Sequence, residues 1–183
     1  MALADDDLRA RARRLRLLLL DVDGVLTDGT VSMDASAGES KSFYIRDGAG
    51  MRWAMRYGLD VGLLSGRPSP VTTRRAAELG IRIVSQSGAL QKLEAFEDIL
   101  SANGYGADEV GYMGDDVLDL AVLGRAGLSA APADAVEEVR SRVHWVSRFP
   151  GGRGAVRELV ELVLGARGQW QDLVQSFLPE DRS

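Results

Sequence analysis

Short apolar runs alternate along this chain with longer segments in which apolar residues recur at helical spacing. The first run lies in Leu15–Asp28, which reads LRLLLLDVDGVLTD. Its leucines are followed by two aspartates that flank one valine. A continuous apolar run that is bounded by charge and glycine indicates a strand buried on both faces of a parallel sheet. Strands are therefore predicted at Leu15–Leu20, Asp60–Leu64, Ile81–Val84, Val110–Met113, Leu128–Ala130 and Val143–Val146.

The segments between these runs have the pattern of amphipathic helices. Ser69 is a candidate N-cap, and Gly58 and Gly80 each follow a helical segment at the point where its pattern stops. Helices are predicted at Asp47–Tyr57, Ser69–Leu79, Gln91–Ala102, Val117–Gly124, Ala135–Arg142 and Ala155–Leu164. Strands and helices that alternate in this way predict an α/β protein with a doubly wound, Rossmann-like parallel sheet and right-handed crossovers.

One segment near the N-terminus departs from this alternation. Thr30–Met33 and Ser40–Ile45 alternate like two short strands, and Asp34–Gly38 between them has the residues of a turn. Two short alternating runs that are joined by a turn are typical of a β-hairpin. We therefore predict a small hairpin insertion over residues 30–45.

The chain gives no indication of a second domain. Only 18 residues separate Gly29 from Gly48, which is too few for a separate cap domain over the strand ends. We expect one domain over residues 1–183, beginning with a leading segment (1–14). The C-terminal tail (169–183) is predicted to be either a frayed end or an arm that reaches a neighbouring copy.

Composition and charge narrow the range of functions. The chain has 183 residues, of which 45% are hydrophobic and 27% charged, so it can bury a sizeable core. Its net charge of −5 argues against general nucleic-acid binding, because a phosphate backbone would be repelled. There is no cysteine, and we find neither a signal-peptide pattern nor an apolar stretch of membrane-spanning length. We expect a cytoplasmic protein that binds neither nucleic acid nor membranes.

Asp21 and Asp23 stand at the carboxyl end of the first predicted strand, where open α/β sheets bind their ligands. Two carboxylates at this spacing on a strand point the same way, and at about 4 Å and an effective dielectric near 20 they repel by about 4 kcal/mol. Such a pair favours a bound cation, and Mg²⁺ suits it because Mg²⁺ binds one or two carboxylates together with water and substrate phosphate. Taken alone, the two aspartates are better explained as the polar end of a strand.

Two further predicted strands end in polar residues, and one helix begins with a lysine. These are Ser65-Gly66-Arg67, Gly114-Asp115-Asp116 and Lys92. Singly, the serine is explained as a turn residue, the lysine as an exposed helix residue and the aspartates as a helix N-cap. Because parallel strands end at one edge of a sheet, together they supply carboxylates for a metal, and a hydroxyl, N–H groups and an ammonium for a phosphate. The combination predicts a site for phosphoryl transfer.

The motifs that carry this chemistry also resemble those of a known family. DVDGVLTDG, LLSGR, Lys92 and GDDVLD resemble, in order, the four motifs of the haloacid dehalogenase superfamily of phosphatases. The stretches GESKSFYIRDGAG and GGRGAVRELVELVL resemble its capless branch, typified by 3-deoxy-D-manno-octulosonate 8-phosphate phosphatase. The resemblance implies a haloacid-dehalogenase-like fold without a cap domain, Mg²⁺ as cofactor, and hydrolysis of this sugar acid phosphate through an aspartyl-phosphate. It also implies a homotetramer in which the hairpins assemble at the centre and the sites lie at subunit interfaces.

The same resemblance implies a role for each motif residue. Asp21 would be the nucleophile, and Asp23 the general acid and then the general base. Ser65 and Lys92 would bind the oxygens of the transferred phosphoryl group. Mg²⁺ would be held by the carboxylates of Asp21 and Asp115 and by the backbone carbonyl of Asp23.

Other residues are implied to act around these. Asp116 and Asp119 would orient the metal-bound waters or Lys92. Contacts to the sugar acid phosphate are implied for Asp23, Tyr44, Ile45, Arg46, Asp47, Gly48, Arg52, Arg67, Arg75 and Lys92, with Arg153 and Arg157 as further candidates. Arginines suit a substrate with a carboxylate and a phosphate, although each is also explained as part of a surface ion pair.

Two alternative functions remain open. The nearer one is a phosphatase of the same branch that acts on a related sugar acid phosphate, such as a sialic-acid-type 9-phosphate. The other is a non-catalytic oligomerisation or binding module, against which the intact set of motif residues argues. Substrate profiling distinguishes the first alternative, and metal-dependent phosphate release distinguishes the second.

Overall fold

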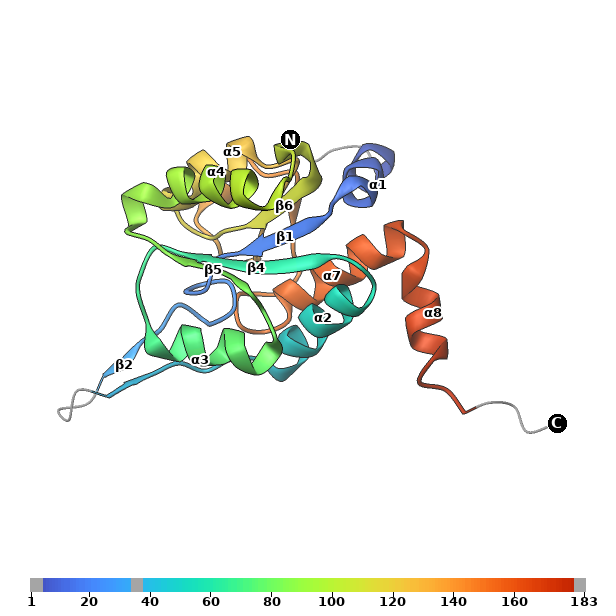
Figure 1. The fold of residues 1–183 in the computed structure, drawn as a ribbon, viewed down its shortest axis with the longest axis horizontal. Helices are drawn as coiled ribbons and strands as arrows, with labels where there is room; N and C mark the ends of the chain where they lie inside the picture. The colour runs from blue at the N-terminus through green and yellow to red at the C-terminus, as the bar shows by residue number, and fades with distance from the viewer. Residues whose placement is uncertain (1–4, 34–37, 180–183) are drawn as a thin grey trace.

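A computed structural model of the protein, which describes residues 5–33 and 38–179, contains one six-stranded parallel sheet (Figure 1). The strands are β1 Leu17–Leu20, β4 Asp60–Ser65, β5 Ile83–Gln86, β6 Val110–Met113, β7 Leu128–Ala131 and β8 Trp145–Val146. They lie in the order β5, β4, β1, β6, β7, β8. The chain passes from β1 outward to β5 and then returns to the other side of β1, as in a doubly wound sheet.

Helices cover both faces of the sheet, with α4 and α5 on one side and α2, α3 and α7 on the other (Figure 1). The longer helices are α1 Asp5–Arg14, α2 Ile45–Arg56, α3 Pro70–Leu79, α4 Lys92–Asn103 and α7 Ala155–Ala166. The shorter ones are α5 Leu120–Arg125, α6 Glu137–Arg140, α8 Gln169–Gln175 and the 3₁₀ turns η1 Ala89–Gln91, η2 Ala107–Glu109 and η3 Val117–Asp119. This arrangement confirms the predicted α/β fold with a parallel sheet.

The central strand β1 consists of four leucines that are buried on both faces. Leu18 and Leu20 belong to the hydrophobic cluster of α1, α2 and α7, whereas Leu17 and Leu19 belong to the cluster of α4 and α5. Burying one leucine side chain contributes about 2 kcal/mol. The apolar run therefore favours the middle of the sheet for β1, and this places the following residue, Asp21, at the edge formed by the strand ends.

The hairpin is shorter than the sequence predicts. Strands β2 (Ser32–Met33) and β3 (Glu39–Ser40) form a two-stranded antiparallel pair. The prediction of a strand over Ser40–Ile45 is wrong beyond its first residue, because β3 ends at Ser40 and α2 begins at Ile45. The predicted turn at Asp34–Gly38 lies, apart from its last residue, outside the described residues.

The two elements at the other edge of the sheet are also shorter than predicted. Helix α6 and strand β8 cover four and two residues in place of Ala135–Arg142 and Val143–Val146. Strand β8 pairs only with Ala130 and Ala131 of β7. Val143 is buried against the helices of that face without pairing in the sheet, so its apolar character reflects packing and not a strand.

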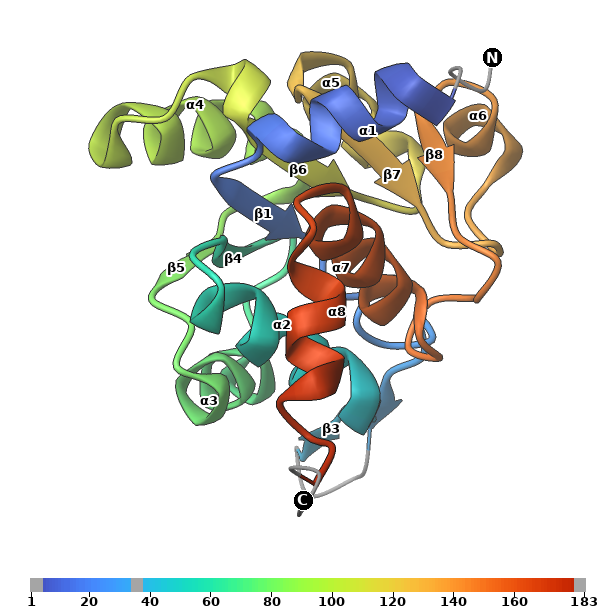
Figure 2. The same cartoon turned by 90° about the vertical axis from the view of Figure 1, so that its right-hand side faces the viewer.

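The tail beyond α7 is helical over α8, which lies across α2 and α7 (Figure 2). The rings of Trp53 in α2 and Trp170 in α8 are 6.2 Å apart between centroids. The guanidinium of Arg157 lies over both rings, 4.3 Å from the first centroid and 5.1 Å from the second. This cation–π contact anchors α8 to the body of the protein.

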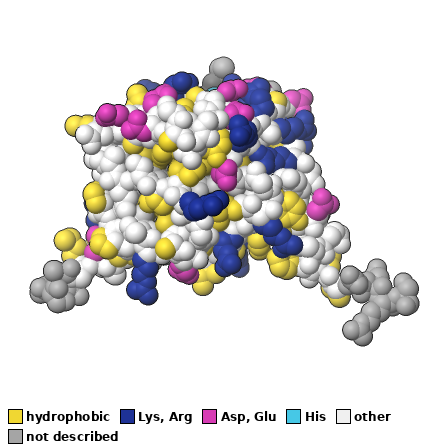
Figure 3. Space-filling view, viewed as in Figure 1, with side chains coloured by type: hydrophobic (Ala, Val, Ile, Leu, Met, Phe, Trp, Pro, Cys, Tyr) yellow, Lys and Arg dark blue, Asp and Glu magenta, His cyan; other side chains and the backbone are white. Residues whose placement is uncertain are grey.

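Two surface properties bear on the sequence analysis. Within the described ranges, no helix combines the length and the hydropathy that crossing a membrane requires. On the face in Figure 3, Lys and Arg side chains are scattered among acidic and hydrophobic ones. This face therefore has no continuous basic patch.

Candidate active site

Three neighbouring strands bring the sequence-predicted residues to one edge of the sheet. Asp21 follows β1, Ser65 ends β4 and Asp115 follows β6. They line a cavity of about 470 Å³ together with Asp23, Gly29, Val31, Gly66, Arg67, Ala89, Lys92, Asp116, Leu118 and Asp119. The motif residues therefore share one cavity, although Asp21 and Lys92, for example, are 71 positions apart in the sequence.

Lys92 at the start of α4 joins two buried carboxylates. Its Nζ donates to Asp21 Oδ2 at 2.8 Å and to Asp119 Oδ1 at 2.7 Å. Burial and the Asp119 carboxylate raise the pKa of Asp21 to about 7, against the opposing effect of the ammonium. Burial disfavours the charge on Lys92, but the two carboxylates more than offset this and raise its pKa. Lys92 therefore stays protonated beside the carboxylate of Asp21.

Asp119 is fully buried and its two oxygens are both engaged. In addition to Lys92, Oδ1 accepts the hydroxyl proton of Tyr112 at 2.5 Å. Its other oxygen accepts the backbone N–H groups of Asp115 at 3.0 Å and Asp116 at 3.2 Å. Asp119 thus holds both the lysine and the loop that follows β6 in place.

A divalent cation fits between the carboxylates of this site. Ligand oxygens of Asp21, Asp115 and Asp119 all lie within 4.8 Å of one another. Burial, together with the carboxylates of Asp21 and Asp119, raises the pKa of Asp115 to about 8 against the opposing effect of Lys92, so a further cation at this site would be favourable. Since carboxylate oxygens are the ligands that Mg²⁺ prefers, the donor set matches the predicted cofactor. Each oxygen of Asp119 accepts two hydrogen bonds, whereas each oxygen of Asp21 accepts one, so Asp21 and Asp115 are the better placed ligands.

Gly24 is required by the close approach of its loop to this cluster. A Cβ atom at this position would overlap the carboxylate of Asp115, and its backbone has a φ of 84° that favours glycine. The turn that contains Asp23 therefore lies directly against a candidate metal ligand.

Asp23 is held by two cations that face it from different elements. Lys41 Nζ lies 2.7 Å from Asp23 Oδ1 and its side chain is fully buried. Arg67 Nε lies 3.3 Å from Asp23 Oδ2 and its other nitrogens pair with Glu39. The same glutamate accepts the hydroxyl of Ser69 at 2.7 Å.

Sequence reasoning did not single out Lys41 or Glu39. Both lie in the hairpin stretch GESKS, where they alternate with serines in the manner of an exposed strand. Their charges reach two residues of the cavity lining, Asp23 and Arg67, because the hairpin folds back over the start of α3, where Lys41 Nζ also lies 3.4 Å from Thr72 Oγ1. Nothing local in the sequence indicates that contact.

Ser65 is buried at the end of β4, and its hydroxyl accepts the N–H of Arg67 at 3.3 Å. A Cβ on the intervening Gly66 would lie 3.1 Å from Cε of Lys92. The serine loop and the lysine are therefore close enough to bind the same phosphate group. Asp116 is exposed at the rim and caps η3 by accepting the N–H of Val117.

Some of the residues named as substrate contacts line the cavity of Asp21, and others line a second cavity. Asp23, Arg67 and Lys92 line the cavity of Asp21. By contrast, Tyr44, Arg46, Arg153 and Arg157 line a separate cavity of about 330 Å³ at the start of α7.

The remaining substrate candidates lie on or near α2. Ile45 and Arg52 are exposed, whereas Asp47 and Gly48 are buried inside their own chain. Arg75 packs over the ring of Phe43 and pairs with Glu78. A single copy of the chain therefore does not bring these residues to the cavity of Asp21.

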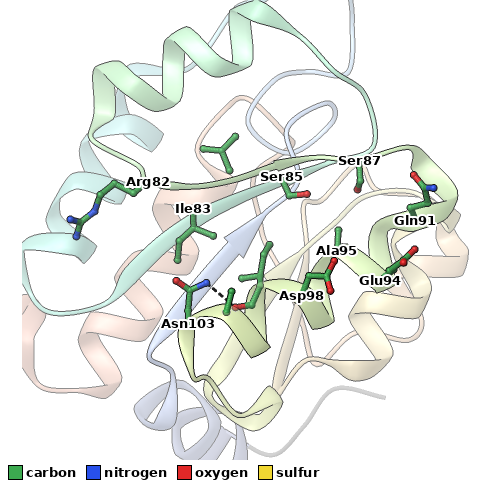
Figure 4. A pocket seen from close by; sticks show the side chains of 12 residues that line it. Arg82, Ile83, Ser85, Ser87, Gln91, Glu94, Ala95, Asp98 and Asn103 are labelled. Atoms are coloured by element: carbon green, nitrogen blue, oxygen red, sulfur yellow. Dashed lines mark hydrogen bonds between the residues drawn. The ribbon is translucent and has the colours of Figure 1, made fainter.

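A larger cavity, of about 530 Å³, lies between the edge strand β5 and helix α4 (Figure 4). Its labelled side chains include Ser85, Ser87, Glu94, Asp98 and Asn103. Its lining contains none of the candidate catalytic residues. The chemistry is thus concentrated in the smaller cavity.

The chain has close relatives among characterised proteins. It is 43% identical over 163 residues to the 3-deoxy-D-manno-octulosonate 8-phosphate phosphatase KdsC of Escherichia coli, a match that covers 89% of this chain and 86% of the relative. A scan against models of protein families gave no match.

Solved structures lead to the same group of proteins. The 3-deoxy-D-manno-octulosonate 8-phosphate phosphatase of Yersinia pestis matches with a TM-score of 0.88 and 39% identity, over 91% of this chain and 89% of that one. The corresponding protein of Moraxella catarrhalis, solved with a magnesium ion, a phosphate ion and a KDO molecule, matches with a TM-score of 0.92 and 31% identity, over 94% and 99% of the two chains.

Proposed function

The chain belongs to the 3-deoxy-D-manno-octulosonate 8-phosphate phosphatase family of the haloacid dehalogenase superfamily, and we propose that Asp21 removes the phosphate from this sugar acid by nucleophilic attack. The protein is a magnesium-dependent phosphoric monoester hydrolase of this type. The roles of its residues rest chiefly on one observation, the ion pair of Asp21 with Lys92 inside a cavity that also holds Ser65 and Asp115.

The first half of the reaction transfers the phosphoryl group to the protein. A carboxylate oxygen of Asp21 attacks phosphorus, and the bond between phosphorus and the sugar oxygen breaks. Asp23, two residues further on and at the same cavity, gives a proton to the departing hydroxyl. The free sugar acid leaves, and the phosphoryl group stays on Asp21 as an aspartyl-phosphate.

The second half returns the nucleophile. Asp23, now ionised, takes a proton from a water molecule that attacks phosphorus, and the bond to Asp21 breaks to release inorganic phosphate. Ser65 donates its hydroxyl proton and Lys92 its ammonium protons to the phosphoryl oxygens in both halves. Because these donors are already held in the buried site, they need no reorganisation when charge develops on phosphorus.

The metal completes the charge balance of the site. We propose that Mg²⁺ is held by the carboxylates of Asp21 and Asp115 and by the backbone carbonyl of Asp23. When bound, Mg²⁺ offsets the repulsion between a phosphate dianion and the carboxylates. The magnesium and phosphate ions in the Moraxella catarrhalis structure support this assignment.

Within the cavity, Arg67 is the cation best placed for the sugar acid. Its side chain is 40% exposed and spans Asp23 and Glu39, so it can exchange part of these ion pairs for a substrate carboxylate or hydroxyl. Ile45, Arg46 and Arg52 are exposed or line another cavity, so we propose that they contact substrate in the site of a second copy. This arrangement fits the predicted homotetramer with sites at subunit interfaces, which light scattering at micromolar concentration tests.

The function itself is tested by phosphate release with Mg²⁺ from a panel that includes 3-deoxy-D-manno-octulosonate 8-phosphate and a sialic-acid-type 9-phosphate. We expect strong preference for the eight-carbon substrate and loss of release in EDTA. Preference for the nine-carbon acid would keep the mechanism but change the substrate. Absence of metal-dependent release from every member would favour a non-catalytic module.

A cytoplasmic location stays a prediction from the sequence.

A further inference from the structure

Asp47 lies in the first turn of α2 and its side chain is buried, with the residue 1% exposed. Its carboxylate does not face the cavity of Asp21. Oδ1 accepts the backbone N–H of Arg157 at 2.8 Å, and Oδ2 accepts that of Gly154 at 3.3 Å. Both donors belong to the start of α7.

These two bonds give α7 an N-terminal cap from another helix. The residue at the N-cap position, Gly154, has no side chain and so supplies no cap of its own. The first N–H groups of a helix have no partner within it, and a carboxylate there also interacts favourably with the helix dipole. Asp47 thereby ties the first turn of α2 to the first turn of α7.

The residues just before α7 form what we call the glycine segment, Gly151–Gly154. It touches the turn that follows Asp21 through backbone alone. The N–H of Gly152 donates to the carbonyl of Val25 at 2.9 Å. A Cβ on Gly151 would overlap the carbonyl oxygen of Gly24, and one on Gly152 would lie 2.6 Å from the carbonyl carbon of Thr27. No side chain fits between the two segments.

The turn at residues 22–27 carries Asp23 and contacts the metal site. It is closed by the N–H groups of Leu26 and Thr27, which donate to the carbonyl of Val22 at 3.0 and 3.1 Å. Its Gly24 lies directly against the carboxylate of Asp115. A shift of the glycine segment therefore moves the backbone of Asp23 relative to Asp115.

We propose that Asp47 is a positioning residue for the phosphatase reaction. By capping α7 it holds the glycine segment, and through this segment it holds the turn that carries Asp23 in the geometry for proton transfer. This inference rests on the proposed function and assigns Asp47 to the support of its own chain's site and not to a contact with substrate. It also explains why a glycine-rich stretch precedes α7.

The test compares Asp47→Ala and Asp47→Asn with wild type, using p-nitrophenyl phosphate and 3-deoxy-D-manno-octulosonate 8-phosphate with saturating Mg²⁺. A mutation far from the reacting atoms that misplaces a catalytic group by about 1 Å can lower the rate about 100-fold. We therefore expect kcat to fall about 10-fold or more in Asp47→Ala. KM should change by less than about 2-fold, because substrate contacts are intact. Asp47→Asn keeps one acceptor oxygen and should recover part of kcat.

Val163→Ala is the matched control for lost stability. Val163 is buried in the same helix, nine residues after Gly154, and does not line the cavity of Asp21. We expect it to lower Tm while leaving kcat within about 2-fold of wild type below the transition. If Asp47→Ala does not fold, Asp47→Asn decides the outcome by the same criteria.

The outcomes separate this inference from the proposed function. An active wild type together with unchanged kcat in the folded Asp47 variants would overturn the inference alone. Equal losses of kcat in Asp47→Asn and in Val163→Ala at matched Tm would overturn it too, because they would reduce Asp47 to a stability residue. An inactive wild type would overturn the proposed function and, with it, this inference.

Discussion

Asp119 accepts a hydrogen bond from Nζ of Lys92 at 2.7 Å in the interior of the protein, although η3 and α4 are separate parts of the chain. The side chain of Lys92 is 5% exposed and that of Asp119 is 0% exposed. The contact fixes the ammonium beside Asp21 before any substrate arrives. It therefore couples the stability of the site to its chemistry.

Asp119→Asn should reduce both activity and stability. The substitution breaks a buried ion pair, which costs about 3 kcal/mol and lowers Tm by about 10 °C in a domain of this size. It also frees Lys92, so kcat should fall about 100-fold. Thermal unfolding and steady-state kinetics measure the two effects. The exposed neighbour Asp116 is the matched control, and Asp116→Asn with an equal loss would contradict a special role for Asp119.

Asp21→Asn should abolish turnover without loss of the fold. Removing a nucleophile leaves little catalysis, so kcat should fall by at least about 1,000-fold. Because the pKa of Asp21 is raised to about 7, the ionised carboxylate that predominates above that pH lowers the stability of the metal-free protein. At pH 8 without Mg²⁺ the variant should therefore unfold at an equal or higher temperature than wild type. Wild-type rates in the purified variant would rule out the aspartyl-phosphate mechanism.

Lys41→Met should lower kcat because Asp23 loses one of its two cationic partners. General acid and base catalysis contributes about 100-fold or more, and a misaimed carboxylate should forfeit about 10-fold of it. The buried lysine makes no contact with the nucleophile, so formation of the metal site should be unaffected. Magnesium titration by calorimetry checks that point, and Lys41→Arg serves as the charge-preserving control. Unchanged kcat in Lys41→Met would mean that Arg67 alone suffices to orient Asp23.

Asp47 should make stability depend on pH in the acid range. Its pKa is raised from 3.8 to about 6, mainly by burial, so the folded protein binds this proton more tightly than the unfolded chain does. Stability from this group is therefore greatest below about pH 4 and falls as the pH rises to about 6. A shift of about two pH units corresponds to about 3 kcal/mol.

The measurement is urea unfolding of metal-free protein between pH 4 and 7. Because Asp21 and Asp115 also have raised pKa values, the informative quantity is the difference between wild type and Asp47→Asn. That difference should change with pH by a few kcal/mol in this interval and level off above about pH 6. A difference that stays constant with pH would refute the assignment of the shift to Asp47.

Local patterns allowed most elements of the sheet to be predicted. β6 was predicted with its observed bounds, and α3 begins after the predicted cap Ser69 and ends at Leu79, followed by Gly80 as its C-cap. Errors concentrate at the hairpin and at β8, where strands of two residues are only weakly specified by their own sequence. Their length depends on what lies beside them, which a local pattern does not contain.

The candidate site was predictable where its residues end strands. Asp21, Ser65 and Asp115 follow apolar runs, and parallel strands deliver their carboxyl ends to one edge, so the cavity followed from the order of motifs. The contact of Lys92 with Asp119 was implied only by the family resemblance and not by the local pattern, and the pairing of Lys41 with Asp23 was not predicted at all. Each joins residues from elements whose relative placement is set only when the helices pack.

The sequence by itself determined the parallel sheet and the gathering of polar groups at its edge, because burial of apolar runs and the direction of parallel strands leave few alternatives. Only the tertiary structure decided which charges meet there, and that Asp47 caps α7 in its own chain. The physical reason is the separation along the sequence over which each effect acts. Hydrophobic periodicity is a property of neighbouring positions, whereas a buried charge takes its partner from whatever element packs within hydrogen-bond distance.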